Sequence, residues 1–323
     1  MSATEVDTST TDLPSGQPVP SSAAPPPKPK PFPLRDLIAA TPSNADAFLA
    51  HLQRCLQTPS GIDTCLLFVC YTSRLSAALL NSLTQPAIQK SANKILAIAN
   101  ALPPSATLIF SSKVLPSPSV AILLTISNRL KALSVLTSEA RTILRLWGLL
   151  SMYFWARRLV LALRQPRESA ANTAADKLER SISWAQLVAC VIFQALENAS
   201  YLSSKGVLGF APATQGKMAR WSARFWGSFV GIEIGRLFYE AHKRSRRTRA
   251  EKFANDKSVA IMEREESEWA ETWRKSVIRN MAWAPLTLHW SLEQGLVNET
   301  TIGALACIPG FLQMRDLWRR TAE

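Results

Sequence analysis

Residues 126–147, ISNRLKALSVLTSEARTILRLW, carry the clearest periodic pattern in the chain and decide its fold class. Apolar residues recur every three or four positions, which is the spacing of one face of an α-helix. The apolar face is formed by Ile126, Leu130, Leu133, Leu136, Ala140, Ile143, Leu144 and Trp147. The opposite face is formed by Ser127, Lys131, Ser134, Ser138, Arg141, Thr142 and Arg145. The sequence therefore predicts an amphipathic helix with a basic polar face.

Two interpretations of this helix remain open. An interfacial membrane helix combines an apolar face, a basic face and bulky anchors, and this stretch has all three. Arg129 lies nearer the apolar side, where its long stem allows the guanidinium to reach the membrane surface. The candidate lipid contacts are Arg129, Leu130, Leu133, Ala140, Arg141, Leu144, Arg145 and Trp147. The alternative is an ordinary core helix with a solvated basic face.

Helical periodicity continues outward from this stretch along most of the chain. Strand-like alternation with turn dipeptides is missing, and only twelve glycines are present, which argues against a strand-rich fold. Pro, Gly and Ser clusters divide the chain into segments. Helical segments are predicted at residues 44–57, 63–83, 85–101, 119–163, 176–204, 217–242 and 300–320. Lys205-Gly206 is a typical helix stop. The predicted fold is an all-α, membrane-associated bundle of amphipathic or marginally transmembrane helices.

Composition divides the chain into three regions. Residues 1–33 are rich in Pro, Ser and Thr and contain a proline run near residues 25–31, so we expect a disordered tail. Residues 34–118 are predicted to form an N-terminal helical region. Residues 119–323 are predicted to form the membrane-associated helical region.

The balance of apolar and charged residues favours a membrane. Hydrophobic residues make up 47% and charged residues 19%, and the formal net charge of +13 favours an anionic partner. No segment offers 18 uninterrupted apolar residues, although residues 146–163, 182–202, 221–239 and 301–314 come close. Such helices either assemble as a bundle within the bilayer or lie along its surface.

Residues 221–239 carry two further features. Glu233 and Arg236 are three residues apart on a helix, so an ion pair between them would lower the penalty of burying them in lipid. Gly227, Gly231 and Gly235 form a stripe that lets a second helix approach closely. The stripe serves either a crossing within one subunit or self-association.

A dense basic run follows this segment. Lys243, Arg244, Arg246, Arg247 and Arg249 form a juxtamembrane cluster of the kind that binds anionic headgroups. A nuclear localisation signal is one alternative. Another is a solvated helix face paired with Glu263, Glu265, Glu266 and Glu268. No nucleic-acid partner is expected, because no nucleic-acid-binding motif accompanies the charge.

We expect no enzymatic activity, cofactor or metal. The chain contains no phosphate-binding loop, dinucleotide fingerprint, nucleophile elbow or zinc-protease motif. His51, His242 and His289 are its only histidines, and the i, i+4 pair of His289 with Glu293 is typical of packing. The five cysteines are scattered in apolar surroundings and are predicted to be free thiols.

Several blocks together resemble the peroxin-11 family, in its divergent fungal form. Residues 194–209 resemble the family's helix that ends in an acid-Asn pair, an aromatic stretch and a Lys-Gly stop. Similar blocks follow at residues 221–226, 236–240, 279–286 and 303–318, and residues 141–148 resemble its Arg-rich Leu-Gly segment. The resemblance covers roughly residues 119–320. The family usually starts close to its first helix, whereas here a proline-rich tail and an extra helical region precede the match.

The resemblance implies a self-associating protein of the peroxisomal membrane that promotes peroxisome elongation, division and proliferation by amphipathic-helix membrane remodelling. Its partners would be anionic membrane lipids and further copies of the chain. An alternative is a pore for metabolites, lined by Glu197, Glu233 and Arg236. A third interpretation is a scaffold whose proline-rich tail recruits a fission adaptor or a dynamin-like GTPase.

Overall fold

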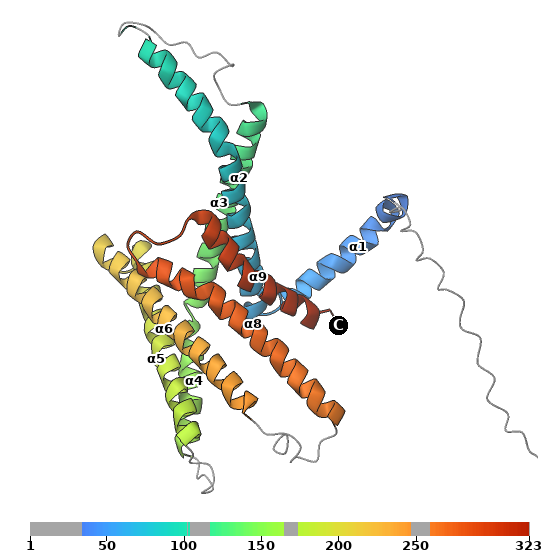
Figure 1. The fold of residues 1–323 in the computed structure, drawn as a ribbon, viewed down its shortest axis with the longest axis vertical. Helices are drawn as coiled ribbons and strands as arrows, with labels where there is room; N and C mark the ends of the chain where they lie inside the picture. The colour runs from blue at the N-terminus through green and yellow to red at the C-terminus, as the bar shows by residue number, and fades with distance from the viewer. Residues whose placement is uncertain (1–33, 102, 104–116, 165–173, 247–258, 323) are drawn as a thin grey trace, which may run out of the picture. The chain divides into compact units, whose positions relative to one another are not determined.

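The computed structural model describes residues 34–101, 103, 117–164, 174–246 and 259–322, and all regular secondary structure in these ranges is helical. The helices are α1 (Leu34–Cys55), α2 (Pro59–Ala101), α3 (Pro118–Arg145), α4 (Gly148–Arg164), α5 (Ala174–Ser204), α6 (Pro212–Ser245), α8 (Val259–Ser291) and α9 (Glu299–Arg320) (Figure 1). The predicted all-α fold is confirmed. The predicted tail of residues 1–33 lies outside the described residues.

The chain divides into two structural units, residues 1–49 and residues 50–323. The second unit contains α2, which packs against both α3 and α9. The structural division thus falls between Leu49 and Ala50, and the helices of the N-terminal and C-terminal parts of the chain pack together within the second unit.

Several helix boundaries differ from the prediction: α1 begins ten residues earlier than predicted, and α8 was not predicted as a separate helix. The segments at residues 63–83 and 85–101 form one helix, α2, which continues through Pro86. Proline removes one backbone donor, and the nearby Thr84 hydroxyl donates to the carbonyls of Leu80 and Asn81 at 3.0 Å each. The single stretch at residues 119–163 is instead two helices, α3 and α4.

The break between α3 and α4 is held against α5. Asn198 donates through Nδ2 to the carbonyl of Leu146 at 3.1 Å. A Cβ on Gly148 would approach the Gln194 side chain to 2.8 Å, so this glycine allows the close contact. The C-terminal end of α5 lies at the predicted site, because Gly206, just beyond it, has a φ of 78°.

Six helices form a closed circuit of contacts. α2 packs against α3 and α9, α9 against α8, α8 against α6, and α6 against α5. Ion pairs and hydrogen bonds between α3 and α5 complete the circuit. The tightly packed core between α2, α8 and α9 contains Leu67, Cys70, Tyr71, Leu286, Ile302 and Ala306. A Cβ on Gly303 would lie 2.8 Å from Leu75 Cα, so α9 and α2 meet almost backbone to backbone.

Three helices in the described part of the chain are long and apolar enough to cross a membrane: α2, α3 and Asp176–Ser204 of α5. Only the last overlaps one of the four segments that the sequence singled out. α2 was missed because residues 63–83 and 85–101 were predicted as separate helices, and neither piece is an obvious span.

Candidate functional site

The pattern of buried and exposed side chains on α3 is the reverse of that on a helix of a soluble protein. Its buried residues are Ser127, Ser134 and Thr137. Its exposed residues include large apolar side chains, with Leu136 65% and Trp147, just beyond the helix end, 77% exposed. Ser127 and Ser134 of the polar face are thus packed inside, although Lys131 and Ser138 of the same face are exposed, and most of the apolar face points outward.

Small polar contacts hold this polar face against α2. Ser127 donates through its hydroxyl to the carbonyl of Ala77 at 2.8 Å. Cys70 Sγ lies 3.4 Å from the carbonyl oxygen of Ser134, about two turns away from the first contact on both helices. Hydroxyls that satisfy neighbouring backbone carbonyls are the usual means of joining helices that cannot gain from burying apolar surface.

Two arginines of the predicted lipid-binding set lie on the inward side of α3, where it contacts α2 and α5. Arg141 Nε is 2.8 Å from Asp63 of α2, and Arg145 is 2.8 Å from Glu197 of α5. These two arginines thus have internal carboxylate partners and join three helices. Arg129, by contrast, is exposed and makes no ion pair with any residue that the structure describes. The residues of the set that face outward are Arg129, Leu133, Leu144 and Trp147, whereas Leu130 and Ala140 are half-buried.

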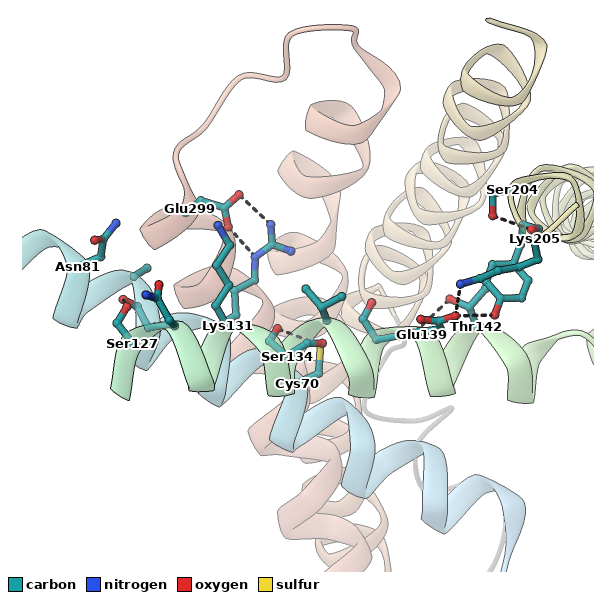
Figure 2. A pocket seen from close by; sticks show the side chains of 17 residues that line it. Cys70, Asn81, Ser127, Lys131, Ser134, Glu139, Thr142, Ser204, Lys205 and Glu299 are labelled. Carbon is teal, nitrogen blue, oxygen red and sulfur yellow. Dashed lines mark hydrogen bonds and ion pairs between the residues drawn. The ribbon is translucent and has the colours of Figure 1, made fainter. Parts of the chain in front are cut away.

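A cleft of about 480 Å³ runs along the polar side of α3 toward α2 and α5. Glu299 lies toward one end of it and Glu139 toward the other (Figure 2). Arg74 donates to Glu299 at 2.8 Å, and this hydrogen bond lowers the pKa of the Glu299 carboxyl. At the other end, Lys205 forms an ion pair with Glu139, and that contact raises the pKa of Lys205.

A second cavity of about 440 Å³ lies in the middle of the helix circuit and is lined by residues of all six helices. Its charged lining consists of Arg141, Arg145 and Glu197. Its aromatic lining includes Trp226, Trp283 and Trp290, and Trp226 stacks on Trp290 with a ring-centroid distance of 5.6 Å. A third cavity shares Glu197 and Trp226 with this one, and Thr142 and Tyr201 with the cleft. The interior is therefore a series of adjoining polar cavities.

The predicted pair on α6 is confirmed. Arg236 lies 2.6 Å from Glu233, and Gln186 of α5 donates to the same carboxylate at 2.7 Å. The hydrogen bond from Arg236 lowers the pKa of Glu233. Arg236 also contacts Glu240 at 2.5 Å, so its charge is shared between two acids. Of the three residues predicted to line a pore, only Glu197 lines a described cavity.

The glycine stripe on α6 has two parts. A Cβ on Gly227 would lie 3.2 Å from the Thr287 hydroxyl, so this glycine serves the crossing of α6 with α8. A Cβ on Gly231 or Gly235 would meet no atom within 4 Å, and both residues are exposed. The stripe is thus divided: Gly227 belongs to an internal crossing, and Gly231 and Gly235 leave an open face.

Two of the three basic residues that the structure describes in this run have acidic partners. Arg244 contacts Glu266 at 2.9 Å and lies over the Trp269 ring, whereas Lys243 is 3.7 Å from Glu179. Arg246 is exposed. Arg247 and Arg249 lie outside the described residues. The predicted pairing with the acids of the following helix is thus found for Arg244.

Several of these partners had no recognisable signal in the sequence. Asp63 and Glu139 are isolated acids in apolar surroundings, and only the fold shows that they face Arg141 and Lys205.

His289 has a packing role: its Nδ1 accepts hydrogen bonds from the backbone N–H groups of Leu296 and Val297. Within the described ranges, no group of three or more His, Cys, Asp or Glu residues is placed to hold a metal ion.

A family model described as Peroxisomal biogenesis factor 11 (PEX11) matches residues 122–318, from the first turns of α3 to the end of α9. The chain belongs to the PEX11 family. It is therefore a peroxisomal membrane protein involved in peroxisome proliferation and division, from a family of biogenesis factors that is not known as an enzyme family. No curated protein and no solved structure matches the chain. The helix α2, which supplies half of the polar seam, lies outside the matched residues.

Proposed function

We propose that the protein promotes peroxisome elongation and division by inserting the apolar face of α3 into the membrane. The observation that carries this proposal is the inverted burial of α3: its buried side chains are those of Ser127, Ser134 and Thr137, while Leu133, Leu136, Leu144 and all its isoleucines are exposed. An exposed apolar surface of this kind on a membrane protein is most stable in contact with lipid.

The geometry supports a one-sided insertion. Only one face of α3 is apolar and exposed, because the opposite face is fixed to α2 through Ser127 and to Asp63 through Arg141. A helix held in this way adds volume to the lipid on one side, which favours curvature. Arg129 lies exposed beside the apolar face, where its guanidinium reaches anionic headgroups.

Charges placed on the outward face test this mechanism. Leu133→Glu combined with Leu144→Glu puts two carboxylates into lipid, at a cost of up to about 3 kcal/mol each near the helix centre. We expect shorter and fewer peroxisomes in cells and loss of tubule formation from liposomes. The matched control is Leu133→Met with Leu144→Met, which keeps both positions apolar. Unchanged peroxisome length and number in the Glu variant would contradict the mechanism.

The open glycines of α6 support self-association as part of the same activity. Gly231 and Gly235 are exposed and leave room for the backbone of a second helix. In this proposal, Gly231→Leu with Gly235→Leu reduces cross-linked dimers in the membrane without changing the fold of the monomer. The control is Gly209→Ala, at another exposed glycine with no atom near its Cβ position. Equal dimer yields in both variants would argue against this face.

A second candidate function is the passage of small solutes, favoured by the adjoining polar cavities inside the helix circuit. Arg145 and Glu197 line the central cavity, and Lys131 lines the cleft that adjoins it through the third cavity. Purified protein in liposomes loaded with small dyes of positive, zero and negative charge tests this candidate. Release that depends on dye charge, and that changes with Lys131→Glu, is the expected result. Retention of the whole series would exclude it.

A further inference from the structure

A basic cleft of about 530 Å³ opens where the first turn of α2 meets α8 and the last turns of α9. Its lining is Ser60, Thr64, Lys275, Arg279, Gln313, Asp316, Arg319 and Arg320. Four cationic side chains therefore face a single carboxylate. A cavity with such an excess of positive charge favours an anion.

The cations are not neutralised equally. Lys275 is bound to Asp316 at 3.0 Å and to Glu271 at 2.9 Å. Arg279 and Arg319, in contrast, make no hydrogen bond or ion pair with any residue in the described part of the chain. Two guanidinium groups therefore remain available for a ligand. Guanidinium groups suit phosphate oxygens, because they donate pairs of parallel hydrogen bonds.

An apolar groove of about 270 Å³ adjoins this cleft. It is lined by Phe68 of α2 and by Phe311, Met314 and Trp318 of α9, with Arg315 and Arg319 at its rim. Arg319 lines both the groove and the cleft. Phe311 is 59% exposed, so the groove is open on its outer side. An apolar channel with phosphate-binding groups at one end has the polarity of a lipid.

The order of the two sites along the helices fits a membrane. Thr64 of the cleft lies in the second turn of α2, near the end of a helix able to span a bilayer, and Phe68 of the groove lies one turn further in. On the antiparallel α9, Phe311 and Met314 likewise precede Arg319, which lies at the helix end. Along α2 and α9, the residues Ser60, Thr64, Arg319 and Arg320 of the cleft thus lie nearer the helix termini than the apolar residues of the groove.

We propose that the cleft and the groove together bind one anionic glycerophospholipid of the surrounding membrane. Its phosphate lies between Arg279 and Arg319, and one acyl chain lies along Phe311, Met314 and Phe68. This site is distinct from the outward face of α3 and from the basic run that begins at Lys243, and it does not depend on the remodelling mechanism. Its role is to select a lipid by head group as well as to hold it.

Native mass spectrometry of the full-length protein in detergent tests the site. The protein is incubated with equal amounts of phosphatidic acid and phosphatidylcholine that carry the same acyl chains, and bound lipid is counted. We expect selective retention of phosphatidic acid, and a fall of about tenfold in Arg279→Gln/Arg319→Gln. The matched control, Arg264→Gln/Arg274→Gln, removes the same charge from exposed positions of α8 and should retain the lipid.

The groove is tested with Phe311→Gln. This exposed position tolerates a polar side chain, and we expect weaker retention of long-chain phosphatidic acid. Glycerol 3-phosphate, which carries the same phosphate without chains, should bind far more weakly to the wild-type protein than the lipid does. Equal retention of the two phospholipids, equal loss in the control, or equal binding of glycerol 3-phosphate would each overturn the proposal. Arg319→Gln alone, at the end of α9, provides a milder variant should the double variant fail to fold.

Discussion

The α2–α3 pair and the α6–α8 pair are built from opposite kinds of contact. α2 and α3 meet through small and polar groups, such as the hydrogen bond from Ser127 to Ala77, and expose large apolar side chains. α6 and α8 meet through rings: Trp226 lies 5.2 Å from Trp283, and Trp273 donates to the carbonyl of Leu237. The first half of α8 exposes charged residues instead, among them Glu263, Arg264 and Glu268.

The difference indicates which solvent each pair is built for. Helices gain nothing from burying apolar side chains against each other when the alternative is lipid, so small residues and hydrogen bonds hold them together. Burying an indole is favourable only where it leaves water. The α2–α3 pair therefore has the kind of contact that holds membrane helices together, whereas the α6–α8 contact depends on buried rings.

The largest expected effect is at the aromatic crossing. Trp283 contacts Trp226, Trp290 and Tyr71, so Trp283→Ala removes the shared partner of three rings. We expect a loss of about 3 kcal/mol in the free energy of unfolding. Thermal unfolding in detergent, followed by near-ultraviolet circular dichroism, measures it. A change below about 1 kcal/mol would show that the crossing does not depend on ring burial.

The contact between α2 and α9 depends on a close approach of the two backbones. Gly303→Ala places a Cβ 2.8 Å from Leu75 Cα, where only a shift of the backbone can relieve the clash. We expect a destabilisation of about 1–3 kcal/mol. Gly231→Ala, with no atom within 4 Å of its Cβ position, is the matched control and should be neutral or slightly stabilising because alanine favours helix. Similar melting temperatures for the two variants would contradict this account of the α2–α9 contact.

Periodicity predicted most of the helices, although not α8 as a separate helix, and it did not predict the direction in which α3 faces. A helical pattern is the same whether its apolar side meets a protein core or lipid. The partners Asp63 and Glu197 were not predicted as such, since contacts 78 and 52 residues apart depend on the whole fold. Glu233 and Arg236 were predicted as a pair because their spacing alone brings them together.

A smaller effect is expected at the polar seam. Ser127→Ala removes the hydroxyl that donates to the Ala77 carbonyl, and we expect a loss of about 0.5–1 kcal/mol, as for hydrogen bonds between membrane helices. Thr125→Ala on the exposed side of α3 is the control, since its hydroxyl bonds only within its own helix. Unfolding in detergent with both variants measures the difference. A loss as large as that of Trp283→Ala would erase the contrast between the two pairs.

The smallest effect is a dependence on pH at the end of the α2–α9 contact. The hydrogen bond from Arg74 lowers the pKa of Glu299 below its ordinary value of 4.5. The folded state therefore favours the ionised carboxylate more strongly than the unfolded state does. The stabilisation is therefore present above that value and is lost as the pH falls through the lower folded pKa. Because the Glu299 side chain is 62% exposed, we expect less than about 1 kcal/mol. Glu299→Gln should lower stability at pH 7, and its difference from the wild type should shrink as the pH falls below 4.5 in unfolding experiments. A difference that stays constant from pH 7 into the acidic range would mean that the charge of Glu299 does not contribute.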